Sequence, residues 1–214
     1  MDLFDAICGR RAVRHYRRDC PSEHVLRQLV DAAIWAPSAM NGQDWHFTVI
    51  TRQALLDRIA ARARLWVREK EPWLAESQEL QTLLAVPGFH MLHHAPVLIV
   101  ISTRADSKWS AETCAAAAQN LMLAATAQGL GSCWIGLAQD WLNSPEGKEA
   151  ISLPVGERVV APLVVGYASK EPHQVSRRKA GVTWIREKSA ETENGETAEP
   201  VVLSGMFGGL VVPG

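Results

Sequence analysis

The chain has few cysteines and no pair of them in a Cys-x-x-Cys motif. Its 214 residues contain four widely spaced cysteines: Cys8, Cys20, Cys114 and Cys133. The first residues also lack a secretory signal, because Asp2 and Asp5 come early and no apolar run follows them. We therefore expect reduced thiols, rather than a disulfide framework or a zinc site, and a cytoplasmic protein.

The chain also lacks an excess of charge of either sign. Its 22 Lys and Arg residues nearly balance its 23 Asp and Glu residues, which gives a formal net charge of −1. A general nucleic-acid binder draws much of its affinity from surplus positive charge, so we expect no nucleic-acid partner. The sequence contains no internal repeat, no glycine-rich dinucleotide fingerprint and no Gly-x-x-x-x-Gly-Lys phosphate loop.

An apolar run long enough for a membrane span is missing as well. The longest candidate, residues 111–128, contains Gln119, Asn120 and Gln128 and ends at Gly129, which leaves it short of the ~20 apolar residues that a span needs. Its pattern instead predicts a helix that is apolar nearly all round and must be buried. In a chain of this size, such a helix indicates that a partner subunit supplies part of its cover.

Hydrophobic periodicity predicts both helices and strands. Ser22 is a good N-cap for a helix that ends near Trp35, shortly before Pro37. Further helices are predicted over residues 52–68 and 144–151, and strands over 46–51, 96–102 and 159–167. The strand at 96–102 is apolar throughout, which is typical of a central strand covered on both faces.

Three arginines cluster in the segment Gly9-Arg10-Arg11-Ala12-Val13-Arg14-His15-Tyr16. A guanidinium is planar and always charged, and it can hold two phosphate or carbonyl oxygens at once. The cluster therefore suits a grip for a phosphorylated small molecule. The alternative is a solvated basic face.

The segment Pro37 to Trp45 has the composition of a loop. Ser38, Asn41 and Gln43 lie at near-alternate positions, so an extended loop could present several hydrogen-bonding groups towards one planar heterocycle. The alternative is a surface loop whose side chains satisfy its own backbone.

Histidines gather at His90, His93 and His94. The spacing of four between His90 and His94 could bind a metal ion if the segment were helical. A Pro-Gly pair just before the cluster and a proline just after it argue against a regular helix, and no nearby carboxylate or cysteine completes a site. We therefore expect no metal site.

Four motifs resemble, in order, those of the FMN-dependent nitroreductase family. Arg10 to Tyr16 resembles its opening Arg-Arg-Ser-Val-Arg-x-Phe/Tyr, and Pro37 to Trp45 resembles Pro-Ser-x-x-Asn-x-Gln-Pro-Trp. Ala115 to Gly136 resembles Ala-x-Gln-Asn-Leu-Leu-Leu-Ala-Ala-x-x-x-Gly-Leu-Gly-Ser-Cys-Trp-Ile-Gly, and Arg178-Lys179 resembles a basic pair after the last strand. The resemblance covers roughly residues 2–187.

The resemblance implies an α+β fold with a central mixed β-sheet flanked by helices. It also implies an intertwined homodimer with two FMN sites, each built from both chains. Residues 1–187 would form the FMN-binding domain. Residues 188–214 lie outside the resemblance and form an acidic linker and an apolar C-terminal arm, which we expect to lie against its own subunit or a partner.

The resemblance implies no catalytic side chain, because flavin N5 carries the hydride. Arg10, Arg178 and Lys179 would neutralise the FMN phosphate. Arg14 would lie near flavin N1 and O2, where negative charge accumulates on reduction, and backbone amides at Ile135-Gly136 would lie near N5. The implied cofactor-binding residues are Arg10, Arg11, Arg14, Pro37, Ser38, Asn41, Gln43, Ile135, Gly136, Arg178 and Lys179.

Residues 65–94 correspond to the variable cover over the flavin, where Trp73 or Phe89 would face substrate, with core packing as the alternative for each.

Two residues depart from the family pattern. Ala12 replaces a serine whose hydroxyl meets the phosphate, and Asp44 replaces a proline. Losing one such hydrogen bond costs on the order of 1 kcal/mol, which weakens FMN retention.

The implied reaction is ping-pong, with NADH or NADPH reducing the flavin before an electron-poor acceptor, such as a nitroaromatic or a quinone, takes the electrons in the same pocket. Two alternatives stay open. One is a relative on this scaffold that removes halogens reductively or fragments the flavin itself. The other is a flavin-binding carrier or redox sensor without turnover.

Overall fold

The structure is a computed structural model that describes residues 1–70, 77–104, 108–172 and 175–185. The chain divides into two units, Met1–Val175 and Ser176–Gly214, and all helices and strands of the described residues belong to the first. The predicted C-terminal arm, residues 188–214, lies outside the described residues. The predicted domain boundary at residue 187 stays a prediction.

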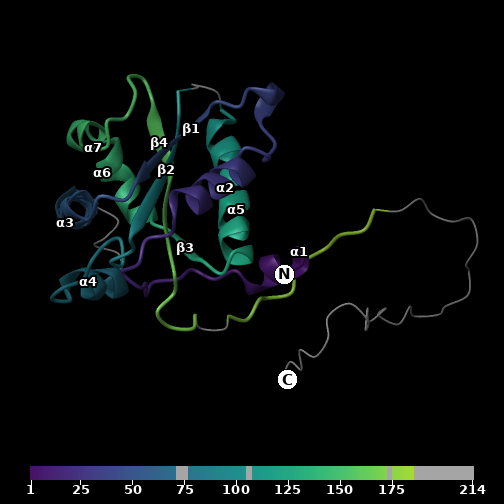
Figure 1. The fold of residues 1–214 in the computed structure, drawn as a ribbon, viewed down its shortest axis with the longest axis horizontal. Coiled ribbons are helices and arrows are strands. Elements are labelled where there is room, and N and C mark those ends of the chain that lie inside the picture. Colours follow the sequence, from purple (N-terminus) through teal and green to yellow (C-terminus); the bar gives the residue numbers. More distant parts are fainter. Residues whose placement is uncertain (71–76, 105–107, 173–174, 186–214) are drawn as a thin grey trace, which may run out of the picture. The chain divides into compact units, whose positions relative to one another are not determined.

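A four-stranded antiparallel sheet in the order β1-β2-β4-β3 forms the centre of the first unit (Figure 1). Its strands are β1 (Trp45–Ile50), β2 (Val97–Thr103), β3 (Gly131–Trp134) and β4 (Arg158–Gly166). Every residue of β2 is buried, which confirms the prediction of a central strand. The expected sheet was mixed, but among the described residues the only parallel pairing is an isolated bridge between Ala12 and Ser132.

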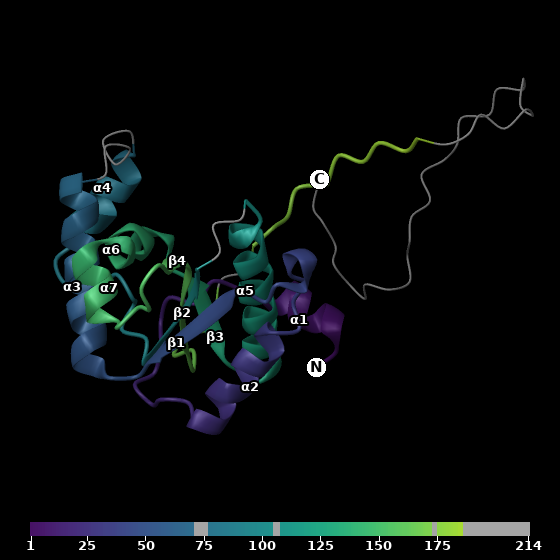
Figure 2. The ribbon, with the colours of Figure 1, turned by 90° about the horizontal axis from the view of Figure 1, so that it is seen from above.

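Helices lie on both sides of the sheet, as Figure 2 shows. One side carries α1 (Leu3–Gly9), α2 (Glu23–Ala33) and α5 (Ser110–Ala127). The other side carries α3 (Gln53–Lys70), α4 (Gln78–Ala85), α6 (Gln139–Asn143) and α7 (Pro145–Ala150). Short 3-10 turns, η1 (Ala39–Asn41) and η3 (Gly136–Ala138), follow α2 and β3. This arrangement confirms the predicted α+β class.

Alternate residues of β2 belong to two hydrophobic cores. Leu98 and Val100 pack in the core beneath α3 and α6, whereas Ile99 and Ile101 pack in the core beneath α2 and α5. Full burial of such a side chain stabilises the fold by roughly 1.5–3 kcal/mol. No described helix is both long enough and apolar enough to cross a membrane.

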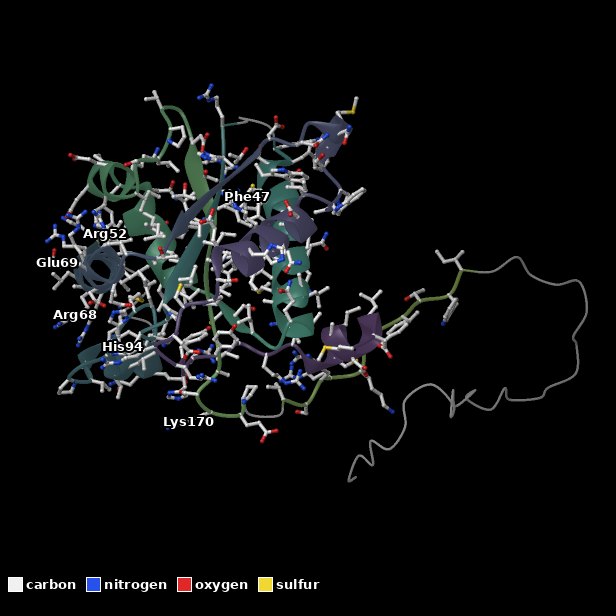
Figure 3. The ribbon with its side chains drawn as sticks, viewed as in Figure 1. Phe47, Arg52, Arg68, Glu69, His94 and Lys170 are labelled. Atoms are coloured by element: carbon white, nitrogen blue, oxygen red, sulfur yellow. The ribbon has the colours of Figure 1, made fainter. Side chains whose placement is uncertain are left out.

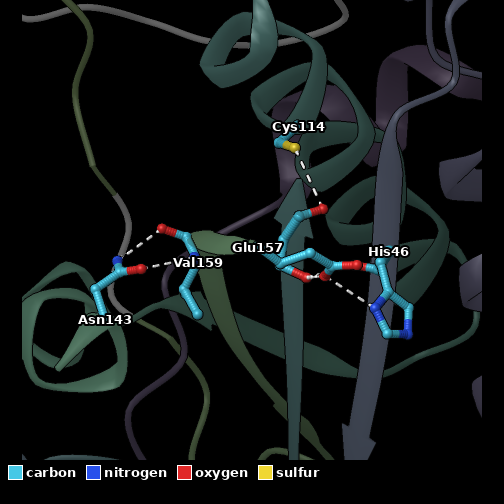
Figure 4. A network of polar contacts seen from close by, with 6 residues as sticks. His46, Cys114, Asn143, Glu157 and Val159 are labelled. Carbon is cyan, nitrogen blue, oxygen red and sulfur yellow. Dashed lines mark hydrogen bonds and ion pairs between the residues drawn. The ribbon is translucent and has the colours of Figure 1, made fainter. Parts of the chain in front are cut away.

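A polar network fixes the start of β4 against its neighbours (Figure 4). The buried Glu157 carboxylate accepts a hydrogen bond from Ser102 Oγ at 2.6 Å and lies 2.9 Å from His46 Nδ1. Asn143 of α6 pairs with both backbone groups of Val159, at 2.8 and 2.9 Å. Because buried polar groups are costly when unpaired, these bonds fix the position of β4 relative to β1, β2 and α6.

Candidate functional site

The arginine segment is an extended chain that runs along the free edge of β3. The Val13 N–H donates to the Ser132 carbonyl at 3.0 Å, and Ala12 forms the bridge with Ser132. Further along, the Ser169 N–H donates to the His15 carbonyl at 2.9 Å. Val13 is buried and Arg14 is exposed, so the segment is anchored by its apolar residue and presents its charge outward.

Gly131 permits the arginine segment to lie close against β3. A Cβ atom at residue 131 would lie 2.6 Å from Val13 Cγ2, nearer than real Cβ contacts allow. Tyr16 adds a second constraint, because its hydroxyl donates to the Val13 carbonyl at 2.7 Å. Burial raises the pKa of Tyr16, with Cys133 adding to the rise, so the phenol stays a neutral donor.

The three arginines have different surroundings. The Arg11 guanidinium donates to the Cys8 carbonyl at 2.5 Å and to the Arg10 carbonyl at 2.9 Å, so it caps the C-terminal end of α1. Within the part of the chain that the structure describes, Arg10 and Arg14 have no carboxylate partner. Arg10 and Arg14 therefore carry uncompensated positive charge, as an anion site requires.

Gly136 is the second residue after β3 and begins η3. The Ile135 N–H donates to the Pro162 carbonyl at 2.8 Å, whereas the Gly136 N–H has no partner among the described residues. Gly136 is exposed, and no atom lies within 4 Å of the position that its Cβ would occupy. Of the two predicted amides, only that of Gly136 is open to a ligand.

The loop after α2 holds its predicted polar residues together. The Gln43 N–H donates to Ser38 Oγ, and Gln43 Nε2 donates to Asn41 Oδ1, both at 3.2 Å. Asn41 and Gln43 are exposed, as is Pro37. Asn41 has a φ of 54°, which asparagine tolerates. Met40 and Gln43 have φ values of 52° and 50°, in the left-handed region that such side chains avoid. Such residues cost about 1–3 kcal/mol each and concentrate at ligand sites.

One chain does not bring the loop and the arginine segment together. The Ala39 N–H donates to Thr113 Oγ1 at the start of α5, whereas Val13 contacts Gly131, just beyond the end of this helix. The two groups thus lie at opposite ends of α5 (Figure 1). At a rise of 1.5 Å per residue, they are separated by about 20 Å.

The predicted cover residues are only partly described. Trp73 lies outside the described residues. Phe89 is half-buried against the core beneath α3 and makes an edge-to-face contact with His93, with ring centroids 6.2 Å apart. These contacts support the packing alternative for Phe89, and its contact with substrate stays a prediction.

His93 is a neighbour of the arginine segment that sequence reasoning did not identify. Burial lowers the pKa of His93 to about 4, and Arg14 contributes to the lowering, so these side chains are near enough to interact. No sequence pattern indicates this proximity, because the two residues are far apart along the chain.

Arg178 and Lys179 belong to the second unit. Both are exposed, on a stretch without helix or strand. Their place beside a phosphate stays a prediction.

Comparison with known proteins gives matches over most of the chain. The profile of the Nitroreductase family matches residues 7–167. A Methanothermobacter thermautotrophicus protein provisionally named NADH dehydrogenase/NAD(P)H nitroreductase is 28% identical over 179 residues, covering 80% of each chain. The 5,6-dimethylbenzimidazole synthase of Rhodospirillum rubrum is 26% identical over 210 residues, covering 83% of this chain and 94% of the synthase.

Solved structures match as well. The crystal structure of a nitroreductase with bound FMN from Bacteroides fragilis has a TM-score of 0.75 at 26% identity, covering 87% of this chain and 100% of that one. An iodotyrosine deiodinase bound to FMN and 3-iodo-L-tyrosine has a TM-score of 0.68 at 22% identity, covering 86% and 100%. At that identity the second match establishes the fold alone.

Proposed function

Because this chain belongs to the nitroreductase family, we propose that it is an FMN-dependent oxidoreductase that uses NADH or NADPH to reduce an electron-poor acceptor. Nitroaromatics and quinones are the acceptor classes that we expect. The observation that carries the proposal is the arginine segment. The edge of β3 holds it in place, and no described carboxylate pairs with Arg10 or Arg14.

The residues at this edge fit FMN in their chemistry. A phosphate dianion needs fixed cations, and Arg10 is the guanidinium that we assign to it. Arg14 would lie beside flavin N1 and O2, where a positive charge stabilises the negative charge of the reduced ring. The Gly136 N–H would donate to N5. When bound, FMN supplies the centre that accepts and returns the hydride, and the chain's residues bind and orient it.

We also propose that two chains share each site. Ser38, Asn41 and Gln43 are assigned to the same flavin ring as Arg14, yet within one chain the two groups are separated by the length of α5. A second chain in a twofold dimer would bring its loop to the first chain's arginines.

The surface of the first unit supports this dimer. Within one chain α5 is buried on one face only, because Ala115, Ala116, Leu123 and Ala124 are half-buried and Gln119 is exposed. A single chain therefore does not bury α5 on all sides, as the sequence predicted for this helix. Large exposed apolar residues occur on the same side of the sheet: Leu3, Phe4 and Ile7 of α1, and Ile34, Trp35 and Met40 after α2. An apolar surface of this kind marks an interface.

The decisive experiment is the visible absorption spectrum of the purified protein, before and after addition of NADH or NADPH without oxygen. We expect a flavin spectrum that bleaches with the nucleotide and returns when a nitroaromatic or quinone is added. A flavin that neither nucleotide reduces would support a carrier or sensor instead. Absence of flavin after reconstitution with FMN would overturn the assignment of the cofactor.

A further inference from the structure

A carboxylate and two imidazoles meet where α3 packs against the segment that follows α4. The ligand atoms of Asp57, His90 and His94 all lie within 4.8 Å of one another, and His90 Nε2 lies 3.1 Å from Asp57 Oδ1. The rings of His90 and His94 stack, with centroids 4.1 Å apart. Figure 3 shows His94 on the α3 side of the molecule, the side that also carries Arg68 and Glu69.

Sequence analysis found no carboxylate near the histidines along the chain, and the fold brings one, Asp57, to them. Asp57 precedes His90 by 33 residues, and only the packing of α3 brings it there. We propose that Asp57, His90 and His94 form a binding site for a divalent transition-metal ion of the zinc class. Imidazole and carboxylate are both common ligands of such ions.

The separations suit this assignment. Ligand atoms bound tetrahedrally to one Zn²⁺ at 2.0–2.2 Å lie about 3.3 Å from one another. The 3.1 Å between His90 Nε2 and Asp57 Oδ1 already matches this value. His94 is exposed, so its ring is free to approach by the remaining distance of no more than about 1.5 Å.

The surrounding structure fixes the backbone that carries the ligands. The Arg64 guanidinium, from the same helix as Asp57, donates to the Leu84 carbonyl at 2.6 and 2.9 Å and to the Phe89 carbonyl at 3.2 Å. Met91 and Leu92, between the two histidines, are fully buried. The segment with His90 is thereby tied to the helix with Asp57, as a preorganised site requires.

The backbone between the histidines is also constrained. The His93 N–H donates to the His90 carbonyl at 2.8 Å, and His93 and His94 have φ values of 53° and 54°. Two consecutive non-glycine residues in the left-handed region cost energy that the surrounding structure must offset. This conformation places the His94 ring over the His90 ring.

The hydrogen bonds of the metal-free cluster define where the proton of His90 lies. His90 Nδ1 accepts from the His94 N–H at 3.1 Å, so Nε2 carries the proton and donates it to Asp57. A neutral imidazole that binds a metal through Nε2 carries its proton on Nδ1. Metal binding therefore moves the proton from Nε2 to Nδ1 and releases the His94 N–H.

Two of the three proposed ligands, Asp57 and His90, line a groove of about 370 Å³. Asp57, Arg64, Arg68, Phe89 and His90 are among its lining residues. Three protein ligands leave at least one position for water or an exogenous ligand. The positive charge of Arg68 on this groove favours an anion in that position.

Zinc titration of the full-length protein, stripped of adventitious metal, tests the proposal by competition with a chromophoric chelator. The exposed thiols Cys8 and Cys20 are first replaced by serine so that they do not compete. We expect one Zn²⁺ per chain. His94→Asn keeps a residue that tolerates the left-handed backbone, and we expect it to weaken binding about 100-fold, with Asp57→Asn weakening it about tenfold.

His24→Asn is the matched control, since His24 is an exposed histidine on α2, and we expect unchanged affinity. In NMR spectra, Zn²⁺ should convert His90 to the Nδ1–H tautomer and shift the His94 amide, which a simple Asp–His ion pair would not do. Equal affinity in all variants, or an equal loss in His24→Asn, would overturn the proposal. The proposal is independent of the flavin assignment, because no readout depends on turnover.

Discussion

Arg10 and Arg11 are neighbours with different partners. Arg11 donates to two backbone carbonyls at the end of α1, whereas Arg10 has no carboxylate partner among the described residues. We expect Arg10→Ala to weaken FMN binding about 10- to 100-fold, because a hydrogen bond to a charged group contributes about 1.5–3 kcal/mol. Titration of the apoprotein with FMN, followed by flavin fluorescence, measures the change.

Arg11→Ala is the comparison for that experiment. We expect it to lower the free energy of unfolding by about 1 kcal/mol, since the end of α1 loses its capping bonds, with little change in FMN affinity. Urea unfolding of the apoprotein measures the stability. An equal loss of FMN affinity in both variants would mean that Arg11 contacts the phosphate directly.

Ala12 stands where the resembled family has serine. We expect Ala12→Ser to tighten FMN binding about fivefold, because one additional hydrogen bond contributes about 1 kcal/mol. Equilibrium dialysis of FMN against both proteins measures the difference. The new hydroxyl could instead pair with Ser132 Oγ, which is buried without a partner in the described residues. In that case the free energy of unfolding would rise and FMN binding would not tighten.

His93 makes stability depend on pH. Its pKa is lowered to about 4, first by burial and then by Arg14, from an ordinary value of about 6.5. Below pH 6.5 the unfolded chain takes up a proton at this residue that the folded chain does not. The free energy of unfolding should therefore fall as pH falls from about 6.5 to about 4, by at most about 3 kcal/mol.

His93→Asn tests this dependence, since asparagine tolerates the left-handed backbone at residue 93 and does not titrate. We expect a flatter pH profile in urea unfolding between pH 7 and pH 4.5. His24→Asn, on the exposed surface of α2, should leave the slope unchanged. If the His93 variant kept the same pH dependence of unfolding, other groups would cause it. His90 would be the first candidate, because burial also lowers its pKa.

At the scale of elements, the contact between β3 and the arginine segment is the structural basis of the proposed site. Gly131→Ala would place a methyl group 2.6 Å from the Val13 side chain. We expect a loss of about 1–3 kcal/mol in stability, as for overpacking, together with weaker FMN binding, because the segment with Arg10 and Arg14 is displaced. Thermal unfolding and FMN titration measure both effects.

Gly9→Ala is the control for this substitution, because no atom lies within 4 Å of the added methyl group. We expect both properties to change little. If Gly131→Ala lowered stability and left FMN affinity unchanged, the edge of β3 would be a structural contact without a role in binding.

At the scale of the whole molecule, the shared site predicts complementation between defective chains. Arg10→Ala removes the guanidinium assigned to the FMN phosphate, near one end of α5. Asn41→Ala removes the side-chain amide assigned to the flavin, near the other end. If each site takes Arg10 from one chain and Asn41 from the other, a dimer of the two variants has one site with both wild-type residues and one site with neither. Equal mixing after unfolding and refolding should then restore about one quarter of the wild-type sites.

The fraction of restored sites is measured by the rate of nitroaromatic reduction and by the amount of tightly bound FMN. Each variant alone, refolded in the same way, provides the baseline. Failure of the mixture to exceed that baseline, with dimers present by light scattering, would place both groups of a site in one chain and contradict the shared arrangement.

The sequence alone determined the local elements and the family. Ser22 caps α2 as predicted, with its side chain 3.4 Å from the Val25 N–H, and the helix ends at Ala33, two residues before the predicted end near Trp35. The apolar run that became β2 and the Ala-rich run that became α5 were also predicted, because periodicity and capping act between residues close in sequence. The short glycine-containing strand β3 was not among the predicted strands, since four residues give too weak a pattern.

Only the tertiary structure decided which distant residues meet. It placed the arginine segment on the edge of β3, brought Asp57 to His90 and His94, and set the arginines and the Ser38 loop at opposite ends of α5. No sequence pattern encodes these contacts, because each depends on how whole helices and strands pack to bury their apolar faces. Local chemistry therefore identified the candidate groups, and packing determined which of them can act together.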